Sequence, residues 1–182
     1  MSEKELVLYH RDGFIGYITL NRPEKRNALN PAVWNAINDA VAKAEADAEA
    51  RVVIVRGEGV SFCAGLDLSP DNALFAALGQ PASAAQKTAF FKEVLHVQGI
   101  HTRLDRLGKP TICVIQKHCL GAGLELALCC DIRLCTQDAV FALPEAKLGF
   151  ITDVGGLQRI VRVVGQGQDR KSTRLNSSHR IR

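Results

Sequence analysis

Hydrophobic and polar positions follow two different periods along the N-terminal third of the chain. Short apolar runs at 6–10 and 14–20 flank Arg-Asp-Gly, which predicts a β-hairpin. Asn30-Pro31 is typical of a helix start, because Asn caps free N–H groups and Pro fits the first turn. Apolar residues then recur at helical spacing over 32–48, so we expect a helix there.

The rest of the chain alternates between strand-like and helix-like runs. Strands are predicted at 52–55, 110–116, 132–135 and 140–142. Helices are predicted at 90–107, from Gly121-Ala-Gly123 to residue 130, and from Gly155-Gly156 to Gly165. The run at 52–55 is apolar throughout, as expected of a strand that is buried on both faces. Alternating strands and helices predict an α/β fold.

Two segments differ in composition from this pattern. Residues 69–86 are rich in Ala, Ser, Pro and Gly, which predicts a mobile surface loop. Residues 169–182 hold five basic side chains and one acid, and so carry the whole formal charge of +4. Residues 169–179 can be back-translated into a common sequencing adapter. We therefore expect an artefactual or disordered tail at 169–182 and a folded core at 1–168.

Charge, hydropathy and cysteine content exclude several classes of protein. Residues 1–168 balance to zero charge, so no basic patch indicates a nucleic-acid partner. No apolar run reaches the ~18 residues of a membrane span. The acidic, polar N-terminus does not resemble a secretory signal. The six cysteines form no C-x-x-C pair, which disfavours zinc, and free thiols are typical of the cytoplasm or an organelle matrix.

Glu125 is the first candidate for chemistry. On a helix it would share its face with Leu128, Cys129 and Ile132, which are all apolar. Burying an unpaired carboxylate is costly and raises its pKa. Such a residue is either paired structurally or kept for proton transfer, and the spacing leaves both readings open.

Two loops of small residues and two further acids add to this candidate site. The loops, 121–123 and 63–67, could offer free backbone N–H groups to an oxyanion, or they could be tight turns. Glu145 follows Pro144 and could be a solvated loop residue, and Asp153 could cap the last helix. Taken together, two donor loops and up to three acids would suit proton transfer next to a carbonyl.

Six motifs along residues 6–168 resemble, in order, those of the enoyl-CoA hydratase/isomerase (crotonase) family. They are ITLNRPEKRNAL at 18–29, FCAGLDL at 62–68, KPTI at 109–112, GAGLELALCCDI at 121–132, PE at 144–145 and GGLQR at 155–159. The resemblance implies a crotonase-like spiral of ββα units that acts on acyl-CoA thioesters.

The same resemblance implies roles for individual residues. The backbone N–H groups of Leu66 and Ala122 would stabilise the thioester oxygen. The family usually has Gly at the second place, and Ala is compatible there if its φ is negative. The implied CoA-binding residues are Lys25, Arg26, Ala28, Ala64, Gly65, Asp67 and Gly121. No metal or redox cofactor is implied, because CoA arrives as part of the substrate.

The acids leave the reaction open. Hydratases of the family carry two glutamates that match Glu125 and Glu145, and this favours hydration of a 2-enoyl-CoA, as in fatty-acid β-oxidation. Asp153 replaces the usual glycine and resembles the Δ3,5-Δ2,4-dienoyl-CoA isomerases, in which Glu145 and Asp153 would move protons. That subgroup usually has Asp at the Glu125 place. A non-catalytic binding or scaffold protein is a third reading, and the intact acids argue against it.

Family members continue past residue 168 with helices that close the acyl pocket and build homotrimers, which commonly pair into hexamers. We therefore expect the fold to be incomplete at its C-terminus and to lack the oligomerisation segment. Apolar surface meant for the missing helices would be exposed. The 182-residue chain is accordingly expected to be poorly soluble or inactive.

Overall fold

A five-stranded sheet organises the chain in this computed structural model, which describes residues 4–70, 72, 83–149 and 151–169. Its strands, in sheet order, are β1 (Val7–Asp12), β2 (Ile15–Leu20), β3 (Val52–Gly57), β4 (Thr111–Ile115) and β6 (Ile132–Cys135). The pair β1–β2 is antiparallel, which confirms the predicted hairpin, and the other neighbours are parallel. A second sheet pairs β5 (His118–Leu120) with β7 (Val140–Ala142).

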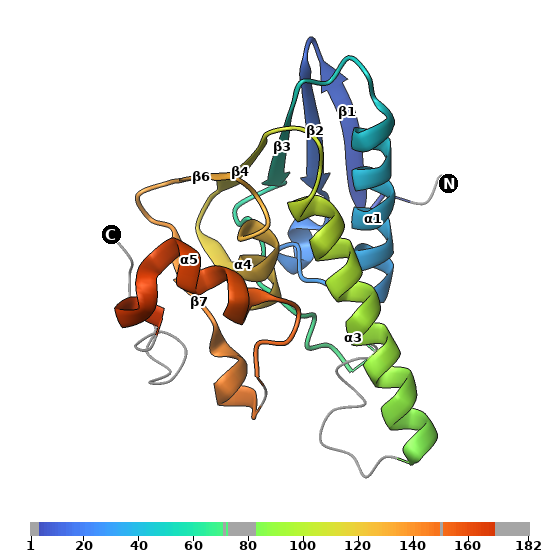
Figure 1. The fold of residues 1–182 in the computed structure, drawn as a ribbon, viewed down its shortest axis with the longest axis vertical. Helices are drawn as coiled ribbons and strands as arrows, with labels where there is room; N and C mark the ends of the chain where they lie inside the picture. Colours follow the sequence, from blue (N-terminus) through green and yellow to red (C-terminus); the bar gives the residue numbers. More distant parts are fainter. Residues whose placement is uncertain (1–3, 71, 73–82, 150, 170–182) are drawn as a thin grey trace.

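Each later turn of the chain runs through a strand of the main sheet, a short extended segment and a helix (Figure 1). The helices are α1 (Pro31–Ala46), α3 (Ala84–Asp105), α4 (Ala122–Ala127) and α5 (Gly156–Asp169), with 3₁₀ helices η1 (Pro23–Lys25) and η2 (Pro144–Leu148). The short segments pair in parallel with one another: Leu29 with Leu66, Cys63 with Cys119, and β5 with β7. This repeated pairing confirms the predicted spiral of ββα units.

Helix α1 begins as its sequence predicts. The Asn30 side chain accepts a hydrogen bond from the Val33 N–H at 3.0 Å, and Pro31 is the first helical residue. The buried face of α1 packs on β1 and β2 and against α3. Trp34 on this face is only 2% exposed, and its indole lies against the ring of His101 on α3. Capping and apolar spacing together therefore set where this helix lies.

Strand β3 is not buried on both faces, and that prediction is wrong. Val53 and Val55 are buried, whereas Val52 and Ile54 are half-buried. Strand β4 alternates in the same way, whereas no residue of β6 is buried and Leu134 on β6 is 55% exposed. The physical reason is that only one face of the sheet packs against the core. Successive side chains of an apolar strand are therefore buried and half-buried in turn.

Two helix ends differ from their predicted positions. Helix α3 begins at Ala84, inside the predicted loop 69–86, because Ser83 and Gln86 form a reciprocal capping box. Helix α4 ends at Ala127, short of residue 130, and Ile132 lies in β6, where it is half-exposed. The rest of the predicted loop, at 71 and 73–82, lies outside the described residues.

The C-terminal elements follow their predicted order. Strands β6 and β7 have the predicted bounds, and α5 begins at Gly156. Gly165 interrupts α5 with a φ of +76°, where the sequence predicts the helix to end. Residues 170–182 of the predicted tail lie outside the described residues. Within the part of the chain that the structure describes, no helix is both long and apolar enough to cross a membrane.

Asn27 ties the loop after β2 to the loop after β3. It is buried, with a left-handed φ of +56°, a conformation that Asn tolerates better than most residues. Its side-chain nitrogen donates to the carbonyl oxygens of Ser61 and Phe62 at 2.9 and 3.0 Å, and also to that of Glu58. Its side-chain oxygen accepts the Arg22 N–H at 2.8 Å. This side chain therefore fixes the start of the loop that carries Leu66.

Replacing Asn27 with Ala should lower the free energy of unfolding by about 3 kcal/mol, because several buried polar groups lose their partner. Urea unfolding followed by circular dichroism measures the change. Asn21→Ala is the matched control, since Asn21 makes an exposed bond to the Glu5 carbonyl. Equal losses in the two variants would contradict the central role of Asn27.

Candidate active site

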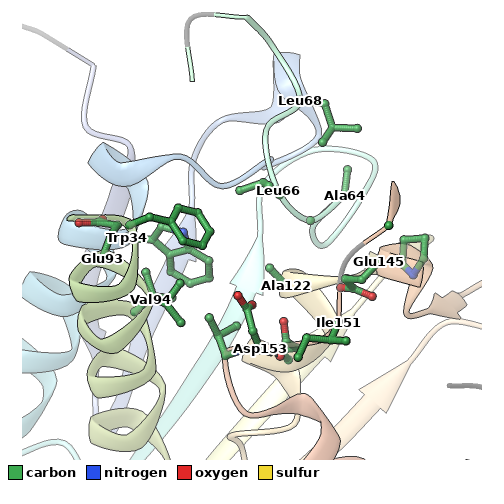
Figure 2. Close-up of a pocket in the computed structure, with 18 residues that line it drawn as sticks. Trp34, Ala64, Leu66, Leu68, Glu93, Val94, Ala122, Glu145, Ile151 and Asp153 are labelled. Atoms are coloured by element: carbon green, nitrogen blue, oxygen red, sulfur yellow. Dashed lines mark hydrogen bonds between the residues drawn. The ribbon is translucent and has the colours of Figure 1, made fainter. Parts of the chain in front are cut away.

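A cavity of about 460 Å³ opens where the short extended segments give way to helices. Helices α1 and α3 form one wall, and the loop after β3, the start of α4, η2 and residues 151–154 form the others (Figure 2). Its large apolar lining residues include Trp34, Leu68, Phe90, Val94, Ile151 and Val154. The size and lining are those of a site for a small molecule with an apolar part.

Two backbone N–H groups, those of Leu66 and Ala122, line this cavity without a partner. Leu29 donates to the Gly65 oxygen and accepts from the Asp67 N–H, each at 2.8 Å, so the N–H of Leu66 between them points away from Leu29. Ala122 is the first residue of α4, where no intrahelical acceptor exists. No residue of the described ranges accepts either group in the structure. Both groups are therefore free to donate to a ligand.

Glycines allow the two donor loops to approach each other. The Cys63 N–H donates to the His118 oxygen at 2.9 Å, and the Leu120 N–H donates to the Cys63 oxygen at 3.1 Å. A Cβ added to Gly65, whose φ is +91°, would lie 2.7 Å from the Leu120 oxygen. A Cβ added to Gly123 would lie 2.7 Å from Cys63 Sγ. Backbone pairing, and the absence of a side chain at Gly65 and Gly123, thus fix the spacing of the two loops that carry Leu66 and Ala122.

Ala122 fits the donor position. It lies in helix α4 and is not among the residues with positive φ. Its methyl group therefore adds no backbone strain, which is the condition that the sequence analysis sets for alanine at this place.

Asp67 holds the first donor loop to the loop after β2. Its carboxylate accepts from Arg22 Nη1 at 2.5 Å, from the Ser69 N–H at 3.0 Å and from the Ser69 hydroxyl. Burial opposes ionisation of Asp67, but these hydrogen bonds outweigh it and lower its pKa to about 2. Asp67 is thus charged and already occupied by protein partners.

The other predicted CoA-binding residues lie near this loop. The Ala64 N–H donates to the Arg26 oxygen at 3.0 Å, which places the two predicted segments side by side. Lys25 and Arg26 are exposed, whereas Ala28 is buried. Gly65 and Gly121 line the cavity together with Ala64. Their contact with CoA stays a prediction.

Glu125 is 2% exposed, as its apolar surroundings predict, and it has structural partners. Its Oε1 accepts the N–H of Val154 at 3.1 Å and the N–H of Gly156 at 2.8 Å. Burial, helped by the charges of Glu145 and Asp153, outweighs these two bonds and raises the pKa of Glu125 to about 8. Glu125 therefore holds a proton at neutral pH.

Glu145 and Asp153 reach into the cavity from either side of Ala122 in Figure 2. The Oε1 of Glu145 lies 2.8 Å from where a Cβ on Gly121 would be, and its Oε2 accepts a long hydrogen bond from the Thr152 hydroxyl at 3.4 Å. Partial burial raises the pKa of both Glu145 and Asp153. Glu125, and not Asp153, accepts the first N–H of α5, so the capping alternative finds no support.

The pattern of apolar residues did not single out the individual side chains of α1 and α3 that close the cavity, above all Trp34 and Val94. Their apolar helical spacing is the same for a core position and for a cavity wall, so no signal could separate the two. His101 supports Trp34 from behind: its Nδ1 donates to the Val97 oxygen at 2.9 Å, and burial lowers its pKa to about 4. It is therefore neutral.

The cysteines lie in the core rather than in a site. Five are buried free thiols, and Cys135 is exposed. Burial raises the pKa of Cys63 to about 12, so this residue is a neutral thiol. Among the described residues, no group of three or more His, Cys, Asp or Glu side chains has an arrangement that could hold a metal ion.

Comparison with known proteins adds two findings on sequence. Residues 10–177 match the sequence profile of the enoyl-CoA hydratase/isomerase family. The chain is 38% identical over 152 residues to the mitochondrial Δ3,5-Δ2,4-dienoyl-CoA isomerase of Mus musculus, covering 82% of this chain and 46% of that protein. It is 33% identical over 164 residues to a Mycobacterium bovis protein assigned as an enoyl-CoA hydratase, covering 90% of this chain and 59% of that protein.

Structural comparison gives the same family. A Thermobifida fusca protein assigned as an enoyl-CoA hydratase, solved in complex with acetoacetyl-CoA, matches with a TM-score of 0.81 and 28% identity. The match covers 95% of this chain and 67% of that one. The chain spans about half the length of the curated relatives it matches.

The raised pKa of Glu125 predicts how stability depends on pH. The folded protein binds this proton more tightly than the unfolded chain, so the stabilisation is complete below the ordinary value of 4.5 and is lost as pH rises through about 8. Glu125→Gln is neutral at every pH and keeps an oxygen acceptor. Its unfolding free energy should therefore fall less than that of the wild type between pH 4.5 and pH 8.

Urea titrations at several pH values measure this difference. Glu145, Asp153 and the Cys129 thiol also face Glu125, but they are present in both proteins and largely cancel in the comparison. Parallel curves of stability against pH for the two proteins would contradict the prediction.

Proposed function

Because the chain belongs to the enoyl-CoA hydratase/isomerase family, we propose that it binds an unsaturated acyl-CoA and acts as a Δ3,5-Δ2,4-dienoyl-CoA isomerase. The observation that carries the proposal is the position of Asp153. Its carboxyl group lines the cavity opposite Glu145, while an oxygen of Glu125 is occupied by the backbone of 154–156. Two carboxyl groups that face one apolar cavity suit proton transfer between two ends of a conjugated chain.

The thioester oxygen would lie between the N–H groups of Leu66 and Ala122. Removing a proton next to the thioester carbonyl moves negative charge onto that oxygen. Two fixed N–H donors stabilise this charge more than they stabilise the neutral carbonyl, and the loss of one such donor typically costs about 10²–10³ in rate. The start of α4 adds no charged side chain before Glu125, so the stabilisation comes from the backbone.

In this proposal Glu145 acts at C2. Its carboxylate lies over Gly121, the residue before the donor Ala122, and C2 is bonded to the thioester carbonyl carbon. As a carboxylate, Glu145 takes a proton from C2 of a 3,5-dienoyl-CoA, and the electron pair spreads along the chain to the thioester oxygen. Asp153, as a carboxylic acid, then gives a proton to C6. The product is the 2,4-dienoyl-CoA, and the number of protons is unchanged.

The substrate's other parts match other surfaces. The apolar wall formed by Trp34, Phe90 and Val94 suits an acyl chain, which gains by leaving water. Lys25 and Arg26 are exposed near Ala64 and suit the phosphates of CoA. A neighbour in the same fold was solved with acetoacetyl-CoA, which supports this class of ligand.

Hydration of a 2-enoyl-CoA is the second candidate, and it is the reaction that the sequence analysis places first. It is favoured by Glu125 and Glu145, which both line the cavity and match the two glutamates of hydratases. In that reaction they would hold and activate a water. The two candidates differ in the residue paired with Glu145: Asp153 for isomerisation, and Glu125 for hydration.

A direct assay separates the candidates. The protein, expressed from its complete gene, is offered a 3,5-dienoyl-CoA and a 2-enoyl-CoA in parallel, and ultraviolet absorbance follows each. We expect a strong gain of 2,4-dienoyl absorbance with the diene. Asp153→Asn and Glu145→Gln should each lower kcat for the diene by about 10²-fold or more, because each loses a proton carrier.

Asp12→Asn is the control, since Asp12 is an exposed acid at the end of β1. Rapid loss of enoyl absorbance with the monoene, undiminished in Asp153→Asn, would establish hydration instead. Stabilisation by CoA esters without turnover of either compound would indicate a binding protein.

A further inference from the structure

Glu125 connects two parts of the site that come from different turns of the spiral. It lies on α4, three residues after the donor Ala122 and therefore almost one helical turn away. Its side chain reaches α5, with which α4 is packed. The same residue thus touches the helix that carries one oxyanion donor and the segment that carries Asp153.

The contact satisfies a local need of α5. The first N–H groups of a helix have no intrahelical acceptor. Here the acceptor for Gly156 is Glu125 Oε1 at 2.8 Å, and the same oxygen accepts from Val154 at 3.1 Å. Val154 directly follows Asp153, so the second bond holds the peptide unit on which the Asp153 side chain is mounted.

Two further contacts leave this segment little freedom. The side-chain nitrogen of Gln98 on α3 donates to the backbone carbonyl oxygen of Asp153 at 2.6 Å. A Cβ on Gly156 would lie 2.7 Å from Glu125 Cγ and 2.6 Å from Thr152 Cγ2, so the glycine is needed for this close packing. Residues 153–156 are therefore held between α3 and α4.

We propose that Glu125 is a positioning residue: by capping α5 through Oε1 it fixes the Asp153 carboxyl group relative to the oxyanion donor Ala122. The inference rests on the proposed isomerase function and goes beyond it by giving the third acid of the cavity a role other than proton transfer. An oxygen acceptor suffices for this role, so Gln can perform it and Ala cannot.

The first test compares Glu125→Gln with Glu125→Ala on the diene, using the protein expressed from its complete gene. Displacing a catalytic group by about 1 Å costs up to about 10²-fold. We expect Glu125→Ala to lower kcat by about tenfold to hundredfold with little change in KM. The kcat of Glu125→Gln should be at least about tenfold higher than that of Glu125→Ala. Adding Asp153→Asn to Glu125→Ala should cost much less than it costs in the wild type, because Asp153 is already misplaced.

The second test substitutes no residue that carries a carboxyl group. Gly156→Ala should displace the Glu125 side chain and lower kcat as Glu125→Ala does. Gly167→Ala is the matched control on the same helix, since nothing lies within 4 Å of an added Cβ there. The third test needs no turnover: amide hydrogen exchange at Val154 and Gly156 should be slow in the wild type and in Glu125→Gln, and faster in Glu125→Ala.

Two results would overturn the inference. One is a Glu125→Gln variant that is as inactive as Glu125→Ala although its Val154 and Gly156 amides still exchange slowly. This result would assign proton transfer to Glu125. The other is equally slow exchange of both amides in Glu125→Ala, which would show that the cap is dispensable. Conversion of the diene by the wild type is judged separately, so the proposed function can stand when this inference fails.

Discussion

The site depends on parallel backbone pairing between short segments of successive turns. Leu29 pairs with Leu66, and Cys63 with Cys119, so each turn is in register with the next without a long strand. In the first of these bridges Leu29 bonds to the residues on either side of Leu66, so the N–H of Leu66 itself points away from Leu29 and takes no part in the pairing. Because the pairing is between backbone groups, these bridges form a backbone frame that sets the positions of the Leu66 and Ala122 N–H groups and the distance between them.

The same frame gathers three acids in one partly buried space. Burial raises the pKa of Glu125, Glu145 and Asp153, and Glu125 is raised further by its two neighbours. A cavity of this kind disfavours three simultaneous negative charges, and Glu125, with a pKa raised to about 8, holds a proton at neutral pH. For Glu145 and Asp153, burial shifts the pKa in the direction that favours the carboxylic acid.

Local rules in the sequence account for much of this architecture. The hairpin, the Asn30-Pro31 helix start and the bounds of β6 and β7 follow from patterns that act within a few residues. The burial of Glu125 also follows from its apolar neighbours. Long-range contacts do not: the Asn27 bonds to the loop after β3, and the Glu125 cap on α5, join segments about 30 residues apart. No periodicity encodes such partners.

Backbone groups and side chains contribute differently to the site, and this explains why both dienoyl-CoA isomerases and enoyl-CoA hydratases match the chain. The donors at Leu66 and Ala122 are peptide N–H groups, so they persist when the side chain changes, as alanine at 122 illustrates. Relatives named as dienoyl-CoA isomerases and as enoyl-CoA hydratases can share this frame. Under the proposed function, the few carboxyl groups that line the cavity would then set the reaction. In this chain Asp153 and Glu125 both line the cavity with Glu145, and under the proposed function Asp153 is the second proton carrier.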